Sequence, residues 1–386
     1  MTAEKHERML LSGNHAVAWG VKLSKPQVIP VYPITPQTPI LEKITDFVNR
    51  GELKAELITP ESEHSAMAAC ITASLTGCRV FTATSSQGLL LMHELLHYGA
   101  GNRASIVMFN VNRTVGSPWG FWPDQTDSLS QRDTGWMQVY CESGQESLDT
   151  VIQAFRIAEQ LSLSIIICHD AFYVSHAVEP VLVPAQELVD EFLPAVNLQH
   201  RLDPAVGASV GSNAEQAVWR RNRMDMAESM DEALTVAVEC SSEWARICGR
   251  DQCGIIELYR CDDADLVFAT MGSMCGTARE AVDALRDKGT RAGLLKIKLF
   301  RPFPVSAVRE ALNGIPRVIV LDRNYSPGMG GILHQELRSA LYGVAKPPAV
   351  YGMLAGVGGV SVSPEKLVEQ AESIRDTSPS YNSEWV

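Results

Sequence analysis

Two segments carry side chains suited to binding a carboxylate. The proline-rich stretch Tyr32–Pro39 holds Thr35, a neutral donor in a stiff loop, and stiffness lowers the cost of positioning it. Arg113 follows the strand-like stretch Ala104–Val111, and a guanidinium forms a fork that matches a carboxylate. A turn that only starts a helix and a solvated surface arginine stay open as alternatives on spacing alone.

Two further positions could bind a cofactor. Glu63 begins an apolar helical stretch, where a carboxylate either meets a partner or simply stabilises the helix start. Ser86 and Gln87 follow the strand-like stretch Arg79–Thr84 and open the next helix. Strand, small hydroxyl residues and helix together suit a polar or anionic ligand, but they also suit an ordinary N-cap.

Aromatic residues gather just after Arg113. Trp119, Phe121 and Trp122 lie within four positions of one another. They are candidates for the wall of a substrate pocket, and core packing is the alternative.

The elements that must position these residues alternate along the first half of the chain. Strands are expected at Val28–Tyr32, Ala55–Thr59, Arg79–Thr84, Ala104–Val111 and Leu163–Cys168, and helices at Pro39–Asn49, Glu63–Thr76, Gln87–Gly99 and Ser147–Gln160. This order predicts an α/β fold with a parallel sheet covered on both faces. Open sheets of this kind bind ligands at the carboxyl ends of their strands.

The chain then changes character and starts a second α/β pattern. We expect a polar connector over 196–229, followed by a helix at Met230–Ile247. The second pattern is predicted to have strands at Asp265–Ala269, Arg291–Lys298 and Arg317–Asp322, and helices at Thr277–Lys288, Val305–Leu312, Gly330–Tyr342 and Pro364–Ser373. The predicted units are therefore 1–195, a connector with a helix at 196–253, and a smaller α/β domain at 254–386.

Composition excludes several classes of function. The 386 residues are 46% hydrophobic, with a formal net charge of -12. Such an acidic chain lacks the excess of positive charge that is typical of nucleic-acid-binding proteins. We find no signal peptide and no apolar run long enough for a membrane span, so we expect a cytoplasmic protein.

Metal and nucleotide motifs are missing from the sequence. The nine cysteines include no C-x-x-C pair, and the densest group, Cys248, Cys253 and Cys261, fits no known cluster or zinc spacing. The turn Gly328–Gly331 resembles a dinucleotide loop, but Leu333 occupies its third glycine position. The Gly-Asp-Gly signature of a magnesium–diphosphate site is also absent. We therefore expect no metal on this chain itself.

Several stretches together resemble a known family. YPITPQTP, ESEHSAM, FTATSSQGLLLMHELL, VNR…DQTDSLSQRDTGW and SHAVEPV are similar to the pyrimidine-domain (alpha) subunit of pyruvate and other 2-oxoacid:ferredoxin oxidoreductases. GSMCGTAREAVDALRDKG, FRPFP and VIVLDRNYSPGMGG resemble the second domain of that subunit, which is related to the transketolase C-terminal domain. The resemblance implies a thiamine diphosphate pyrimidine-binding domain followed by a transketolase C-terminal-like domain.

The resemblance also implies roles for single residues. Glu63 would contact N1′ of the aminopyrimidine and so promote loss of the proton from C2 of the thiazolium ring. Thr35 and Arg113 would bind the substrate carboxylate, and Ser86 and Gln87 would lie at the cofactor. Trp119 and Trp122 make the substrate loop bulky, which leaves room for a larger or aromatic 2-oxo acid such as phenylglyoxylate in place of pyruvate.

Partner subunits are implied by what the chain lacks. In the family, the diphosphate site with its Mg²⁺ and the iron–sulfur clusters lie on other chains or domains. A hetero-oligomer of anaerobic metabolism, converting a 2-oxo acid and coenzyme A to an acyl-CoA and passing electrons to ferredoxin or another acceptor, is therefore expected. A structural subunit without catalytic residues and a transketolase-like or decarboxylase-type enzyme without clusters are the alternatives.

Overall fold

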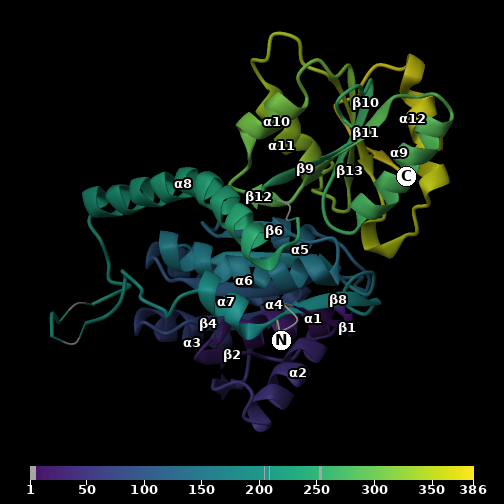
Figure 1. The fold of residues 1–386 in the computed structure, drawn as a ribbon. Helices are drawn as coiled ribbons and strands as arrows, with labels where there is room; N and C mark the ends of the chain where they lie inside the picture. The colour runs from purple at the N-terminus through teal and green to yellow at the C-terminus, as the bar shows by residue number, and fades with distance from the viewer. Residues whose placement is uncertain (1–5, 204, 208, 252–253) are drawn as a thin grey trace.

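The computed structural model describes residues 6–203, 205–207, 209–251 and 254–386, which form two α/β bodies (Figure 1). The first is built on a seven-stranded sheet of order β12-β6-β7-β5-β4-β2-β3. All its pairs are parallel except β12 with β6. Its strands are β2 (Val28–Pro30), β3 (Glu56–Ile58), β4 (Val80–Thr84), β5 (Ile106–Asn112), β6 (Met137–Tyr140), β7 (Ile165–Asp170) and β12 (Leu299–Arg301).

Helices cover both faces of this sheet. Val107, Phe109 and Val111 of β5 point to a core that includes α1, α2 and α6, whereas Ile106 and Met108 point to a core that includes α3 and α4. These buried alternating side chains confirm the expected parallel sheet with two covered faces. The helices are α1 (Gly13–Ser24), α2 (Thr38–Asn49), α3 (Glu63–Leu75), α4 (Ser86–Gly101), α5 (Thr126–Leu129), α6 (Gly144–Leu161) and α7 (Gln186–Phe192). A separate antiparallel pair joins β1 (His6–Ser12) to β8 (Val178–Pro184).

The second body has a six-stranded sheet of order β15-β14-β13-β10-β11-β9, with only β9 antiparallel to its neighbour. The strands are β9 (Ile256–Tyr259), β10 (Leu266–Thr270), β11 (Ala292–Ile297), β13 (Arg317–Asp322), β14 (Ala349–Leu354) and β15 (Glu384–Trp385). The helices are α9 (Met274–Asp287), α10 (Val305–Ala311), α11 (Ile332–Leu341) and α12 (Pro364–Ser373), with 3-10 turns η1 (Val357–Gly359) and η2 (Ile374–Asp376).

The prediction for residues 216–229 was wrong. Helix α8 runs from Gln216 to Cys248, so its first turns occupy part of the expected connector. This end of α8 lies beside the end of α4, where Asn222 donates to the Gly101 carbonyl at 2.9 Å (Figure 1). Its residues are mostly exposed on every side, which removes the apolar periodicity that marks a helix, while Ala, Arg, Met and Glu still favour one.

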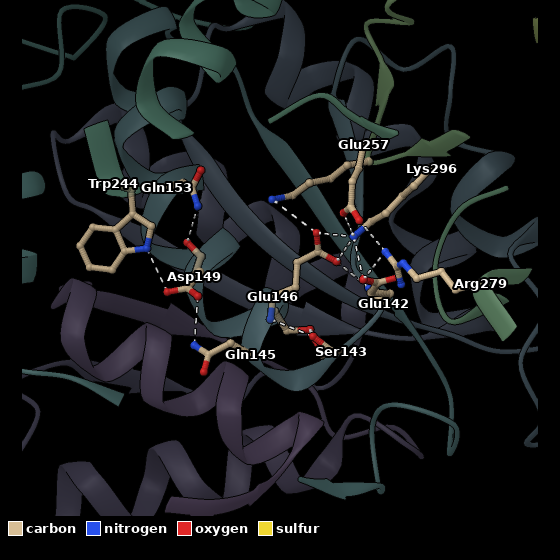
Figure 2. Close-up of polar contacts among 12 residues, drawn as sticks. Glu142, Ser143, Gln145, Glu146, Asp149, Gln153, Trp244, Glu257, Arg279 and Lys296 are labelled. Atoms are coloured by element: carbon tan, nitrogen blue, oxygen red, sulfur yellow. Dashed lines mark hydrogen bonds and ion pairs between the residues drawn. The ribbon is translucent and has the colours of Figure 1, made fainter. Parts of the chain in front are cut away.

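Charged side chains join the two bodies (Figure 2). Lys296 on β11 is 2% exposed, and its Nζ lies 3.0 Å from Glu146 on α6 and 3.1 Å from Glu142. Arg279 on α9 lies 2.8 Å from both Glu142 and Glu257. Because each charge in this interdomain ion cluster has opposite charges beside it, its burial is compensated.

A strand that crosses from one body to the other also joins them. The chain leaves β11 and forms β12, which pairs antiparallel with β6 at the edge of the first sheet. Phe300 of β12 lies 6.1 Å from Tyr140 of β6, ring centroid to centroid, within a hydrophobic cluster that includes residues of both bodies. The first sheet is thus completed by a strand from the second half of the chain.

Candidate functional site

The carboxyl ends of β2, β4 and β5 meet at one edge of the first sheet. Parallel pairing fixes this arrangement, because each strand must return through a helix to the same end. Thr35 follows β2, Ser86 follows β4 and Arg113 follows β5, while Glu63 begins the helix after β3. The predicted residues are therefore brought to the same edge.

Glu63 is the first residue of α3, and its side chain lies against Gly88 of α4. Ser62 caps the helix by accepting the N–H of Ser65 at 3.3 Å, so Glu63 is not the cap. The Glu63 residue is 7% exposed, and a Cβ added to Gly88 would come within 2.5 Å of its Oε1. Among the described residues, none donates a hydrogen bond to this carboxylate. The buried hydroxyl of Thr84, which has no partner, lies on the same side of Gly88, also 2.5 Å from the added Cβ.

Arg113 is buried, with its guanidinium held at both ends. Nη1 donates to the backbone carbonyl of Thr35, and Nη2 donates to the side chain of Gln87. Burial lowers the pKa of Arg113, and the carboxylates of Asp127 and Glu63 oppose that shift. The cation thus lies in the field of Glu63, and Thr35 contributes its backbone carbonyl to this contact, while the residue itself is exposed.

Asp127 fixes the loops around this cation. The carboxylate is fully buried, and burial raises its pKa to about 6, against the effect of the donors around it. These donors are the backbone N–H groups of Ser86 (3.0 Å), Arg113 (3.1 Å) and Ser128 (2.7 Å) and the amides of Asn110 (3.1 Å) and Asn112 (2.6 Å). Sequence reasoning missed this residue, although it lies in the quoted stretch DQTDSLSQRDTGW, because one buried acid in the four-residue helix α5 gives no periodic signal.

Ser86 and Gln87 take part in the same network. Ser86 has a left-handed φ of 48°, and its hydroxyl lies within hydrogen-bonding distance of the Thr114 carbonyl and of Gln87. Gln87 accepts from both Ser86 and Arg113. Both residues were predicted to lie at the cofactor, and in this structure their polar groups connect α4 to the arginine.

The aromatic residues divide into two groups. Trp119 and Phe121 pack edge to face at 5.3 Å, and their rings lie 5.4 Å and 5.7 Å from Cζ of Arg113. Trp122 instead packs against Phe172 at 5.5 Å. All three side chains are about half exposed, at 56%, 45% and 53%. Trp119 is therefore beside the cation, as a pocket wall requires, whereas Trp122 is not.

In the second body, the glycine-rich turn Gly328–Gly331 is followed by backbone N–H groups that already bind a carboxylate of this chain, Asp322. The carboxylate of Asp322 accepts the N–H groups of Leu333 and His334 at 2.8 Å and 3.0 Å, at the N-terminus of α11. Burial raises the pKa of Asp322 to about 6. Because these amides are already bonded, the turn does not offer them to a phosphate, in agreement with its incomplete dinucleotide motif.

The part of the chain that the structure describes has no cluster of metal-binding side chains. It contains no group of three or more His, Cys, Asp or Glu side chains placed to hold a metal ion. His93, Glu94 and His97 on α4 have the H-E-x-x-H spacing, but Nδ1 of His93 lies 2.6 Å from the Gln131 side chain. Eight cysteines are free, and Cys253 lies outside the described residues. Among the same residues, no helix is both long and apolar enough to cross a membrane.

Comparison with known sequences gives matches along nearly the whole chain. Residues 19–241 match the family described as "Pyruvate flavodoxin/ferredoxin oxidoreductase, thiamine diP-bdg", and residues 264–367 match "Pyruvate:ferredoxin oxidoreductase core domain II". The chain is 44% identical to the pyruvate synthase subunit PorA of Methanothermobacter thermautotrophicus, over 98% of this chain and 97% of that protein. It is 46% identical to the ketoisovalerate oxidoreductase subunit VorA of Pyrococcus horikoshii, over 95% and 94%.

Solved structures share the fold. The 2-oxoglutarate:ferredoxin oxidoreductase from Magnetococcus marinus matches with a TM-score of 0.73 at 19% identity, covering 97% of this chain and 66% of that chain. A split-gene transketolase matches with a TM-score of 0.55 at 12% identity, covering 94% and 96%. Fold, motifs and sequence identity agree, and the chain belongs to the pyruvate:ferredoxin/flavodoxin oxidoreductase family, as a relative of its PorA and VorA subunits.

Proposed function

We propose that this chain supplies the pyrimidine-side carboxylate and the substrate-binding cation of a thiamine diphosphate-dependent 2-oxoacid:acceptor oxidoreductase. The complete enzyme would oxidatively decarboxylate a 2-oxo acid to an acyl-CoA. One observation carries the proposal: a buried carboxylate, Glu63, and a buried guanidinium, Arg113, share one strand-end edge without pairing to each other. A purely structural ion pair would bring them into contact.

The residues present fit the cofactor. Thiamine diphosphate, when bound, supplies the carbon nucleophile at C2 and takes up the electrons left by decarboxylation. Glu63 offers a carboxylate without a described donor, as a ring nitrogen that shares a proton would need. Thr84 adds an unpartnered buried hydroxyl on the same side of Gly88. These groups would hold the aminopyrimidine ring and keep a proton at N1′.

Arg113 acts on the substrate. Its guanidinium would bind the carboxylate of the 2-oxo acid as a charged hydrogen-bond pair and orient the neighbouring carbonyl carbon. The contacts with Thr35 and Gln87 hold the fork in place before substrate arrives. Carbon dioxide leaves as a neutral molecule and its electron pair stays on the substrate carbon, so Arg113 would lose its carboxylate partner and keep only its contacts within the chain. The Thr35 side chain, exposed beside this fork, would add a neutral donor.

Partner chains complete the proposed enzyme. We assign the diphosphate and Mg²⁺ site and the iron–sulfur clusters to other subunits, with ferredoxin or a similar protein as electron acceptor. The absence of the corresponding motifs from this sequence supports that division, and the named relatives are themselves subunits. A cytoplasmic location belongs to the same proposal.

The substrate is the open part of the proposal. The relatives' names indicate pyruvate or ketoisovalerate, and the half-exposed Trp119 and Phe121 beside Arg113 favour a substrate with a larger side chain than pyruvate. An aromatic 2-oxo acid such as phenylglyoxylate is the second candidate.

The test compares two carboxylate variants in the assembled complex. Glu63→Gln should slow hydrogen–deuterium exchange at C2 of the bound cofactor by ~10²–10⁴, the usual contribution of general acid–base catalysis. Glu61→Gln, at an exposed carboxylate two residues earlier, should leave that exchange unchanged. Equal exchange rates in both variants would assign Glu63 a structural role only. The isolated chain should show no 2-oxo acid oxidation and no tight cofactor binding; turnover without partner subunits would contradict the division of labour.

A further inference from the structure

The segment that carries the aromatic residues is closed on itself beside Arg113. Thr114 donates its backbone N–H to the carbonyl of Trp122 at 3.1 Å. Its hydroxyl lies 2.7 Å from both the carbonyl and the N–H of Gly120. Residues 114–122, called here the aromatic loop, therefore form one unit whose position sets the space next to Arg113.

The second body meets this loop at the turn η1. The backbone of Gly359 lies against Trp122, since a Cβ added to Gly359 would come within 2.4 Å of Trp122 Cβ. Tyr173, in the segment after β7, donates its hydroxyl to the Gly359 carbonyl at 3.0 Å. The neighbouring Gly358 faces open space, and an added Cβ there would be 4.0 Å from the nearest atom, Thr114 Cγ2.

The turn is anchored by a buried ion pair between the two bodies. Arg323, after β13, is 6% exposed, and its Nη1 donates to Asp170, at the end of β7, at 2.9 Å. The same atom lies 2.6 Å from the Ser273 hydroxyl. A Cβ added to Gly356, just before the turn, would come within 3.1 Å of Arg323 Nε. The turn is therefore not free to move independently of the first body.

We propose that Gly359 is a positioning residue for substrate selection. The second body, through the backbone at Gly359, sets how closely the aromatic loop stands to Arg113, and so which side chains of a 2-oxo acid fit. The inference rests on the proposed function, because it takes Arg113 as the partner of the substrate carboxylate. A pocket wall held by backbone contact discriminates by volume, and one extra or missing methylene changes kcat/KM by about 10–200-fold.

Two alanine variants of adjacent glycines test the proposal in the assembled complex. Gly358 and Gly359 both have left-handed φ values, 66° and 80°, so alanine carries a similar backbone penalty at either position. Gly359→Ala must displace Trp122, whereas Gly358→Ala meets nothing closer than 4.0 Å. The ratio of kcat/KM for pyruvate to that for an aryl glyoxylate should move toward unity by about tenfold in Gly359→Ala, because a displaced wall discriminates less.

The control and a second readout make the outcome decisive. In Gly358→Ala the ratio should stay that of the parent enzyme. Backbone hydrogen–deuterium exchange of residues 114–122, followed by mass spectrometry, should rise in Gly359→Ala alone. The same ratio in both variants, or an unchanged ratio in Gly359→Ala, would overturn the proposal.

Should Gly359→Ala fail to assemble, Tyr173→Phe replaces it. This variant removes the hydrogen bond to the Gly359 carbonyl without adding volume. It should move the ratio in the same direction, and an unmoved ratio would count against the role of Gly359. Missing C2 exchange in the unmodified complex would instead defeat the proposed function, so the two failures are distinguishable.

Discussion

The carboxylate of Glu63 lies directly against the backbone of Gly88, with room for nothing larger than hydrogen between them. A Cβ at Gly88 would be 2.5 Å from Glu63 Oε1 and 2.5 Å from Thr84 Oγ1. Gly88 is inside α4, where glycine costs about 1 kcal/mol relative to alanine and no unusual φ is required. The close approach of the carboxylate therefore explains why glycine stands at this position.

Replacing Gly88 with alanine should displace Glu63. Misplacement of a catalytic group by about 1 Å costs on the order of 10²-fold in rate, so C2 exchange of the bound cofactor should slow by that amount. Gly101→Ala, at the other end of α4 with no atom within 4 Å, is the matched control and should exchange at the parent rate. If both variants exchange equally fast, the contact has no bearing on Glu63.

Part of this site could be predicted from the sequence, because three residues follow predicted elements. Thr35, Glu63 and Arg113 each lie next to a strand or helix whose periodicity is clear, and parallel strands bring such positions to one edge. Asp127 could not be predicted from periodicity, since its partners come from separate elements: β5 and the residue after it, the start of α4, and α5 itself. Trp119 and Trp122 were predicted to share one role, but only Trp119 lies beside Arg113. Trp122 instead contacts Gly359, which is more than 200 positions away in the sequence and could not be foreseen from it.

Some strands and helices of the fold could likewise be predicted from the sequence, and others could not. Short apolar runs predicted β4, β5, β7 and β13 closely, whereas short strands such as β6 and β12 carry too few residues for a pattern. The start of α8 was missed because, among residues 216–229, Met226 alone is buried, which leaves no apolar periodicity.

Asp127→Asn should loosen the loop that carries Arg113. An amide presents its own N–H₂ group to donors that now meet a carboxylate, so at least one buried donor loses its partner. We expect a loss of about 1–3 kcal/mol in the free energy of unfolding and a rise in KM for the 2-oxo acid. Asp133→Asn, at a side chain that is 80% exposed, should change neither. Equal stability of the two variants in chemical denaturation would contradict this role.

The raised pKa of Asp127 predicts a pH effect. Burial lifts its pKa from 3.8 to about 6, so the folded chain takes up this proton before the unfolded chain does. Asp127 therefore adds stability as the pH falls from about 6 to 4, up to about 3 kcal/mol. His169 acts in the opposite sense, because burial lowers its pKa to about 3 and the unfolded chain protonates first below pH 6.5. When the pH is lowered from 7 to 4.5, the free energy of unfolding of Asp127→Asn should therefore fall more than that of the parent, as measured by chemical denaturation. A smaller fall would show that the pKa of Asp127 is not raised in the folded chain.

Arg113→Ala should weaken all 2-oxo acids about equally. Loss of a hydrogen bond to a charged group costs about 1.5–3 kcal/mol, which corresponds to a fall of about 10–150-fold in kcat/KM. The carboxylate is common to every substrate, so pyruvate, a branched 2-oxo acid and an aryl glyoxylate should fall by similar factors in steady-state kinetics. A fall confined to one of them would move Arg113 from the carboxylate to the side-chain pocket.

The interdomain ion cluster should be far more sensitive than a surface ion pair. Burial alone would raise the pKa of Glu146, but the charges of Lys296 and Lys298 together with hydrogen bonds lower it overall, so the carboxylate is held ionised. Lys296→Met leaves that charge less compensated and should cost about 3–5 kcal/mol of stability. Lys288→Met removes an exposed pair with Glu372 at 3.1 Å and should cost less than about 1 kcal/mol. Similar unfolding midpoints for the two variants would show that the cluster adds little.

The crossing strand β12 bears on how the chain is made. Until residues 299–301 have left the ribosome, β6 is an open edge of the first sheet, with unpaired backbone groups that another nascent chain could pair with. The first body therefore cannot be completed before β9, β10, α9 and β11 of the second body have been synthesised. A fragment cut between the two bodies would leave the backbone groups of β6 unpaired in the same way. The whole chain is therefore the unit to express, to exchange between relatives or to engineer.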